Sequence, residues 1–222
     1  NILFGRQAAS GLTTGSSNIA MGTGTLGGDT GATTTGDSNV TIGNLTAVKA
    51  TSAACNVLIG QAAGRCIDTA QQNIYLGRYA GYNTSSGSNN ILMGRTSGCK
   101  LTTQQGNIAI GMCTLLNLCQ TGGINEGCYN VAIGHKAGLA AYRDNHSVMI
   151  GLCAGGGQTC TTGYNIFLGA YAGQVQGTDT TGGCNFAFGY RSMICVTSGN
   201  QNIAIGYDAL YSVTSGLSLI HI

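Results

Sequence analysis

The sequence predicts an all-β protein, a parallel β-solenoid or β-roll of about 13 coils with a basic repeat of 17 residues. The first observation is a recurring five-residue word, Asn-aliphatic-x-aliphatic-Gly: NIAIG stands at 107–111 and again at 202–206, and NVAIG stands at 130–134. The second is that the word alternates with a period of two, as a strand does. The third is composition: 38 Gly and no Pro in 222 residues, with Gly too frequent for helices. We therefore expect residues 1–222 to form a single repeat array.

The glycine that ends each word defines the repeat. Twelve words align on it, eleven of them begin with Asn, and the exception begins with Ser147. The commonest step between words is 17 residues, and steps of 21, 23, 18 and 20 residues also occur. We interpret the extra residues as inserted loops, near 27–36, 117–128 and 174–183. The aligned glycines are Gly5, Gly22, Gly43, Gly60, Gly77, Gly94, Gly111, Gly134, Gly151, Gly169, Gly189 and Gly206.

Each word is expected to form one short strand, which the glycine closes in a conformation that other residues avoid. A weaker apolar position follows six or seven residues after the glycine, and Thr/Ser-rich turns complete the coil. Two short strands and two turns would thus make one coil. The first strands are expected within 1–5, 18–22, 39–43, 56–60, 73–77, 90–94, 107–111, 130–134, 147–151, 165–169, 185–189 and 202–206, with LIHI at 219–222 as a thirteenth. The second apolar position is Leu12, Ile67, Leu101, Leu118, Val196 or Val213.

The asparagine that opens each word predicts an amide ladder along one corner, in which each side chain hydrogen-bonds the next coil. This role is structural, so these side chains are not expected to bind a ligand. The ladder residues are Asn18, Asn39, Asn56, Asn73, Asn90, Asn107, Asn130, Asn165, Asn185 and Asn202.

The middle residue of each word is expected to face outward, yet it is almost always apolar. A strand that is apolar on both faces is buried on both faces. The favoured explanation is a homo-oligomer or filament of this chain, and the alternative is packing under another part of a longer protein. The residues predicted at the oligomer interface are Leu58, Tyr75, Leu92, Met149 and Phe167.

Ten cysteines favour disulfides in an oxidising compartment, with buried free thiols as the alternative. Cys55 and Cys184 both precede an Asn, and each is followed 11 residues later by a second cysteine. This repeated spacing predicts Cys55–Cys66 and Cys184–Cys195 disulfides within single coils. A looser duplicate pairs Cys113 with Cys119 and Cys153 with Cys160. Cys119–Cys128 is a rival pairing, and Cys99 has no assigned partner.

The charged residues favour no reaction. The seven carboxylates occupy different coils and different register positions, so no catalytic pair is expected. His135 and His146 stand near Asp144, but the arrangement fits solvated turn residues better than a triad. Arg78 and Arg95 share a register position with Arg6 and His135. This column could bind an anionic glycan, but isolated charges in contact with solvent are the favoured interpretation. We expect no enzyme activity, no catalytic residue, no cofactor and no metal. A net charge of +2 and short apolar runs predict neither nucleic-acid binding nor membrane insertion.

Certain words resemble known repeat families. NVAIGHKAG, NIAIGYDAL and NIYLGRYAG resemble the head repeats of trimeric autotransporter adhesins, and GGGQTCTTGYNIFLGAYAG resembles Gly/Asn-rich repeats of bacteriophage tail fibres. The resemblance implies a left-handed roll, three chains about one axis, and a location outside the cell, on its surface or on a virion. The 17-residue step and the ten cysteines favour the phage-fibre or other filament side.

The predicted function is therefore a structural or adhesive fibre with receptor contacts, to a cell-surface glycan or protein, in its inserted loops. The alternatives are an ice-binding solenoid, suggested by Thr13-Thr14, Thr102-Thr103 and Thr161-Thr162, or the non-catalytic part of a glycan-degrading tailspike. Because the chain begins on a repeat, stops within one and shows no polar cap, we expect a fragment of a longer fibre.

Overall fold

The computed structural model describes residues 1–27, 33–118, 127–141, 144–157, 163–175, 182–195 and 197–222. Its regular secondary structure consists of β-strands, and no helix occurs in the described ranges. The strands are β1 (Ile2–Phe4), β2 (Ile19–Met21), β3 (Val40–Ile42), β4 (Val57–Ile59), β5 (Ile74–Leu76), β6 (Ile91–Met93), β7 (Ile108–Ile110), β8 (Val131–Ile133), β9 (Val148–Ile150), β10 (Ile166–Leu168), β11 (Phe186–Phe188), β12 (Ile203–Ile205) and β13 (Ile220–His221). The fold is a parallel β-solenoid, as predicted, and each strand lies within its predicted word.

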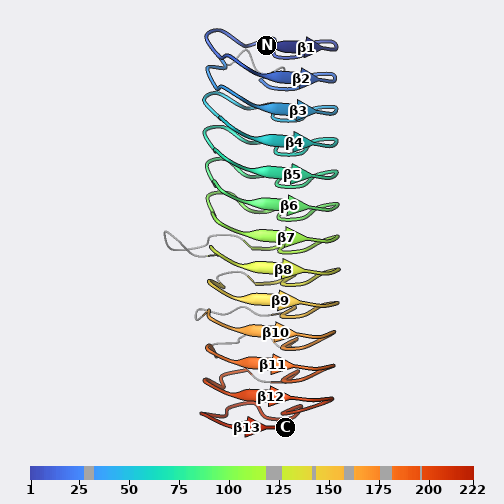
Figure 1. Cartoon of the computed structure of the whole chain (residues 1–222), viewed down its shortest axis with the longest axis vertical. Helices are drawn as coiled ribbons and strands as arrows, with labels where there is room; N and C mark the ends of the chain where they lie inside the picture. Colours follow the sequence, from blue (N-terminus) through green and yellow to red (C-terminus); the bar gives the residue numbers. More distant parts are fainter. Residues whose placement is uncertain (28–32, 119–126, 142–143, 158–162, 176–181, 196) are drawn as a thin grey trace. The chain divides into compact units, whose positions relative to one another are not determined.

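The chain forms two compact units, Asn1–Gly106 and Asn107–Ile222. In the first unit, strands β1 to β6 pair in sequence order and in parallel. In the second, strands β7 to β13 do the same. Within each unit, Figure 1 shows one strand per coil, with every strand directly beside its sequence neighbour.

The strand register confirms the repeat alignment. Within 17-residue coils, Val57 stands opposite Ile74, and Ile74 stands opposite Ile91. The same register survives the longer steps, because Ile108 stands opposite Val131 across a 23-residue step. The extra residues of this step therefore do not shift the register of the strands. The inserted segments fall largely outside the described residues, which omit 28–32, 119–126 and 176–181.

The middle residue of each word faces inward, which corrects the predicted oligomer interface. The five residues assigned to that interface belong to the core: Leu58, Tyr75, Leu92, Met149 and Phe167 are all 2% exposed or less. The physical reason is the period of the strand. The opening Asn is buried, and the middle residue, two positions later, must point to the same side. The aliphatic residues on either side of it consequently face outward.

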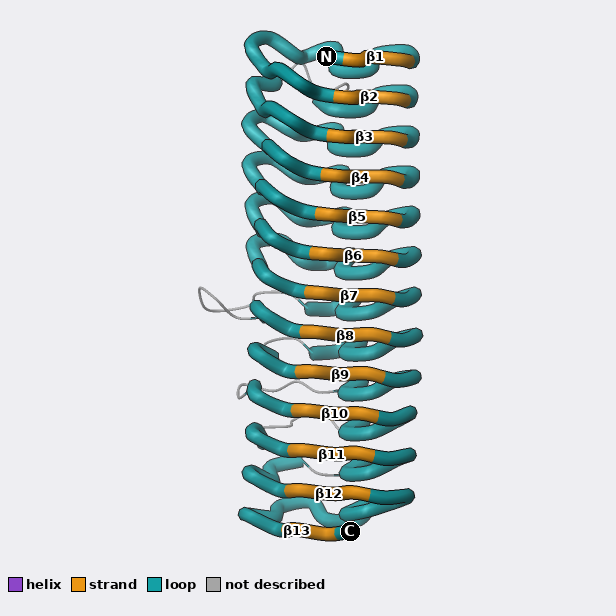
Figure 2. The backbone as a smooth tube through the Cα atoms, viewed as in Figure 1, coloured by secondary structure: helices purple, strands orange, loops and turns teal. Residues whose placement is uncertain are grey.

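The opposite wall of the coil is less regular than predicted. Instead of a second strand, it shows isolated bridges such as Ala54 with Gln71, and Figure 2 draws this wall almost entirely as loop. Its apolar residues still serve the core, since Ile67, Leu101 and Leu118 are fully buried. Leu12 and Val213 are half-buried, and Val196 lies outside the described residues.

The glycine that closes each word is required by both backbone and space. Gly77 has φ +139°, a conformation that residues with side chains rarely adopt. A Cβ on Gly77 would also lie 2.6 Å from the carbonyl oxygen of Gly94, the equivalent glycine of the next coil. Close stacking of successive coils at this corner thus explains why every word keeps its glycine.

Candidate functional site

The predicted asparagine ladder is present and buried. Asn73 Nδ2 donates to Asn56 Oδ1 at 3.0 Å, and the backbone N–H of Asn73 donates to the same oxygen at 3.0 Å. Asn73 Nδ2 also donates to the carbonyl of Gly87 in the next coil, at 3.0 Å. Each amide of this type therefore bonds the coil before it and the coil after it. In this coil the amide is thus hydrogen-bonded to the protein, as the structural role predicted for the ladder requires.

In the second unit the same backbone contact links Asn130 to Asn107 at 3.0 Å, Asn185 to Asn165 at 3.0 Å and Asn202 to Asn185 at 3.1 Å. In each pair the N–H of the later residue donates to the side-chain oxygen of the earlier one. The ladder thus recurs in both units.

Ser147 replaces Asn in the ladder but keeps its backbone contacts: the Ser147 N–H donates to Asn130 Oδ1 at 3.0 Å, and Ser147 Oγ accepts a hydrogen bond from the Asn165 N–H at 2.9 Å. Ser147 Oγ donates to Asp144 Oδ1 at 2.8 Å, and both residues are fully buried. Burial raises the pKa of the Asp144 carboxyl to about 7, against the hydrogen bond from Ser147, which lowers it. His146 lies between the two in sequence but faces outward, where its ring stacks on Tyr129 at 5.2 Å and Tyr164 at 5.0 Å. Asp144, His146 and Ser147 are therefore not arranged as a catalytic triad.

The outer face of the strands is apolar. Its two columns are formed by the residues on either side of each buried middle residue, and in β1 to β12 all of them are Ile, Val, Leu, Met or Phe. We call this surface the outer strand face. Away from the terminal strands, its members at least 37% exposed are Met21, Ile59, Ile74, Ile150, Ile166, Phe188 and Ile203. Sequence reasoning had placed an apolar stripe on the outside but had assigned it to the wrong residues.

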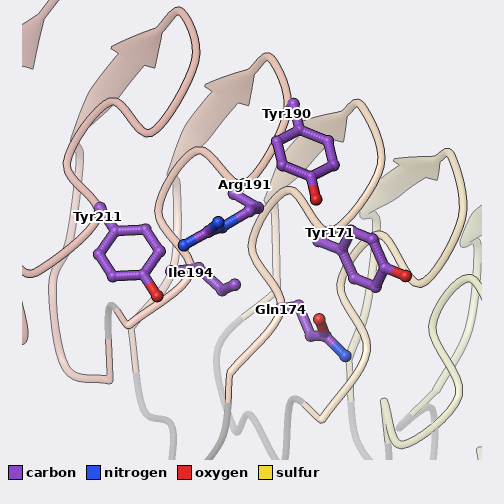
Figure 3. Close-up of a pocket in the computed structure, with 6 residues that line it drawn as sticks. All are labelled: Tyr171, Gln174, Tyr190, Arg191, Ile194 and Tyr211. Atoms are coloured by element: carbon purple, nitrogen blue, oxygen red, sulfur yellow. The ribbon is translucent and has the colours of Figure 1, made fainter.

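A second candidate site lies in the second unit, on the turns that follow β10, β11 and β12. It is an open pocket of about 290 Å³, and Figure 3 shows the six side chains that line it. Its lining residues are Tyr171, Gln174, Tyr190, Arg191, Ile194 and Tyr211. We call it the Tyr/Arg pocket. The sequence signal that could have found it is the recurrence of Tyr one, two or five residues after the closing glycine in three successive coils.

The first unit carries a related cluster. The Arg78 guanidinium lies over the Tyr79 ring at 4.7 Å, and Tyr79 meets Tyr82 edge to face at 5.5 Å. Arg65 Nη1 donates to the Tyr82 hydroxyl at 2.8 Å. Of the predicted arginine column, Arg78 therefore contacts an aromatic ring, and Arg95 remains exposed in the next coil. His135 belongs to the second unit and is half-buried.

Neither predicted disulfide is formed. Cys55, Cys66, Cys184 and Cys195 are free thiols. Cys55 is exposed beside the buried Asn56, and Cys66 is half-buried beside the buried Ile67. An exposed Cys55 thiol does not lie in the interior that a disulfide across the coil would have to cross. The pairs Cys113/Cys119, Cys153/Cys160 and Cys119/Cys128 each include a residue outside the described ranges.

The hydroxyl pairs are more regular than sequence reasoning recognised. In the first unit a Thr or Ser pair stands five and four residues before each ladder position, with one break at Asp68-Thr69. The pairs are Thr13-Thr14, Thr34-Thr35, Thr51-Ser52, Ser85-Ser86 and Thr102-Thr103. The first member turns toward the stack: Thr34 Oγ1 donates to Ala50 O at 2.9 Å, and Ser85 Oγ donates to Thr102 O at 3.2 Å. The fully exposed hydroxyls thus form mainly one column. Thr161-Thr162 lies outside the described residues.

Among the residues that the structure describes, no three His, Cys, Asp or Glu side chains come together as metal ligands would. None of those residues forms a helix with the length and apolar character that a membrane crossing needs. Comparisons of the chain with protein-family models, with curated proteins and with solved structures find no match. The resemblance to adhesin heads and phage fibres therefore stays a prediction from the repeat words.

Proposed function

We propose that this chain is the repeat region of an extracellular or virion-borne structural fibre, which self-associates through the outer strand face and adheres through its loops. The observation that carries the proposal is the outer strand face itself. Each unit presents two unbroken columns of aliphatic or aromatic side chains, with exposures of 37–51% at seven positions away from the ends. Apolar surface of this continuity is typical of interaction sites.

A second copy of the chain is the partner that fits this surface. In β1 to β12 the outer strand face carries no charged residue, so it offers nothing to a charged partner. Its side chains repeat at the strand spacing of about 4.8 Å. An identical face repeats at the same spacing, so the rows of two copies can interdigitate along each unit. We take the arrangement to be a left-handed homotrimer about an axis parallel to the stack, as the family resemblance implies.

The burial of the middle residues also changes the expected fate of single chains when the oligomer dissociates. The core of each coil is formed by its own middle residues, such as Leu58 and Leu92. A single chain therefore contains a complete interior, and separated chains should stay folded. Sequence reasoning had placed Leu58 and Leu92 at the interface between chains instead.

The test is the mass of the particle in solution. Ile59→Lys, Ile74→Lys, Ile150→Lys and Ile166→Lys together place four charges on the outer strand face. The matched control adds the same four charges elsewhere on the surface, at Gln61, Gln71, Ser86 and Ser198, all exposed. Sedimentation equilibrium should give a trimer for the unchanged chain and the control, and a folded monomer for the outer-face variant. A monomeric unchanged chain at tens of micromolar would overturn the proposal.

Ice binding is the weaker alternative. It draws support from the recurring hydroxyl pairs, but an ice-binding surface needs two exposed hydroxyl columns on a flat sheet. Here the Thr34 and Ser85 hydroxyls bond backbone carbonyls, and the sheet face is aliphatic. Thermal hysteresis above that of an inert protein would revive this alternative.

A further inference from the structure

The Tyr/Arg pocket is assembled from three successive coils in the second unit. Tyr171 follows β10, Tyr190 and Arg191 follow β11, and Tyr211 lies on the turn after β12 (Figure 3). Backbone hydrogen bonds hold the coils in register here: the Arg191 N–H donates to Ala170 O at 3.0 Å. The aromatic groups therefore sit on a stacked backbone whose spacing is fixed, and do not depend on an inserted loop.

The arginine at the centre of this pocket is held from several sides. Its guanidinium lies 4.6 Å from the centroid of the Tyr211 ring and 5.8 Å from that of Tyr190. Arg191 Nε lies 3.2 Å from Asp208 Oδ1, an ion pair without the geometry of a hydrogen bond. Contact with the Tyr211 hydroxyl is the largest effect on the pKa of Arg191 and raises it, with a further rise from Asp208. The planar cation is thus oriented, and its charge is balanced locally.

These groups match the chemistry of a sugar ring. A pyranose has an apolar face of C–H groups that stacks on a tyrosine ring, and hydroxyls at its edge that need donors and acceptors together. Tyr190 is 41% exposed and its ring stacks on Tyr207 at 5.2 Å, so a sugar would stack on the part of the Tyr190 ring that Tyr207 does not cover. The Gln174 amide supplies a donor and an acceptor at the rim of the pocket, and the Arg191 guanidinium supplies further donors.

The charge balance selects a neutral ligand. A phosphate backbone would require several unpaired cations, whereas Arg191 is paired with Asp208 and the whole chain has a net charge of only +2. A purely apolar ligand would cover the Gln174 amide without offering it a hydrogen-bond partner. We propose that Tyr171, Gln174, Tyr190, Arg191 and Tyr211 form a binding site for a neutral oligosaccharide. The site deepens the adhesive role proposed above and rests on it for its biological meaning, and it moves a receptor contact from the loops to the stacked coils.

The experiment uses the full chain on an array of immobilised neutral oligosaccharides built from glucose, galactose, mannose, N-acetylglucosamine and N-acetylgalactosamine. Sialylated and sulfated oligosaccharides form the charged arm. Titration calorimetry then measures the best neutral binder against Tyr190→Ala and Tyr211→Ala. The control is Tyr164→Ala, since Tyr164 is 62% exposed on a different corner, before a ladder position. Circular dichroism and sedimentation of every variant confirm fold and particle mass.

We expect at least one neutral oligosaccharide to bind, with affinity at least about tenfold weaker in each pocket variant and unchanged in the control. The site is refuted if no neutral oligosaccharide binds, if only charged ones bind and added salt removes them, or if the control variant is affected and the pocket variants are not. Because particle mass is recorded separately, absent binding by an intact trimer overturns the sugar site alone. A monomeric unchanged chain overturns the fibre proposal, whatever it binds.

Discussion

Asn73 in the first unit and Ser147 in the second occupy the same register position, the residue that opens a strand word. Their side chains hydrogen-bond the neighbouring coils in different ways. In the first, one amide joins three coils through Asn56 Oδ1, Gly87 O and the N–H of Asn90. In the second, Ser147 has no amide nitrogen to donate to the next coil, but its Oγ accepts from the Asn165 N–H at 2.9 Å and donates to the Asp144 carboxyl at 2.8 Å. The Asn130 amide keeps the regular ladder contact, here with the Asp144 carbonyl, as Asn73 does with Gly87 O.

The presence of Ser instead of Asn at position 147 goes with a change at the residue three positions before the ladder position. It is Ala70 before Asn73 and Gly87 before Asn90, where little room remains: a Cβ on Gly87 would lie 2.3 Å from Gln104 O. In the Ser147 coil this position is Asp144, whose carboxyl accepts a hydrogen bond from Ser147 Oγ, while before Asn107 it is the buried Gln104. The interior therefore tolerates loss of an amide when a neighbour in the same coil supplies a polar group, and the consequence is a carboxyl that titrates near neutral pH.

Among the variants that test the two coils against each other, the largest expected effect comes from breaking the regular coil. Asn73→Ala removes an amide whose oxygen accepts two hydrogen bonds from Asn90 and whose nitrogen donates to Gly87 O. Several buried polar groups lose their partners, so we expect unfolding free energy to fall by about 3–5 kcal/mol. Urea unfolding followed by circular dichroism measures it. Gln71→Ala, an exposed neighbour, should stay within about 0.5 kcal/mol. An equal fall in unfolding free energy for Asn73→Ala and Gln71→Ala would show that the ladder hydrogen bonds do not stabilise the fold.

A smaller and pH-dependent effect is expected in the irregular coil. The folded pKa of Asp144, about 7, lies above its ordinary value of 3.8. The folded protein therefore holds this proton more tightly than the unfolded chain does. The stabilisation is complete below about pH 4 and is lost as pH rises through about 7. Asp144→Asn removes this titration.

The measurement for Asp144 is unfolding free energy at pH 4, 6 and 8. Relative to Asp144→Asn, the unchanged chain should lose about 2–4 kcal/mol over that range. Asp37→Asn is the control, because Asp37 is exposed and hydrogen bonds from Ser16 lower its pKa, the opposite direction. Parallel pH profiles for the unchanged chain and Asp144→Asn would contradict the assignment.

The smallest effect is expected just beside the ladder. Cys55 precedes Asn56 as His146 precedes Ser147, and both side chains face outward. Serine already occupies this register position, with the same left-handed backbone, at Ser17 and Ser38. Cys55→Ser should therefore change unfolding free energy by less than about 0.5 kcal/mol, with or without reductant. A fall of several degrees in Tm on reduction would show that a disulfide involving Cys55 forms after all.

The sequence predicts the strands, their register and the ladder because these depend on residues that repeat. The inward and outward faces of the strands were assigned wrongly, although the spacing of the same residues indicates the right assignment. Asn56 and Leu58 are two positions apart, so a buried ladder requires a buried middle residue. Weighing the aliphatic residues alone led to the opposite choice, since Val57 and Ile59 look more like core than Asn56 does. Burial of an amide that is hydrogen-bonded to the protein outweighed hydrophobicity here.

The Tyr/Arg pocket could not be predicted with the same security. Tyr171 and Arg191 share a register position, so an aligned repeat brings them together, but Tyr211 comes from a different turn position. Whether its ring meets the Arg191 guanidinium depends on side-chain rotamers, which repeat spacing does not determine. The Asp144–Ser147 hydrogen bond is similar: the missing Asn at 147 was visible, but its compensation by Asp144 depends on interior space.

Two adjacent residues of β4 test the assignment of inside and outside most directly. Leu58 is 1% exposed and Ile59 is 37% exposed. The measurement is thermal unfolding by far-ultraviolet circular dichroism of Leu58→Lys and Ile59→Lys at one chain concentration. The account predicts that Leu58→Lys loses the cooperative transition, since a buried unpaired charge has no partner in the core. Ile59→Lys should keep its β spectrum and a cooperative transition, even if its association changes. A folded Leu58→Lys beside an unfolded Ile59→Lys would contradict the account.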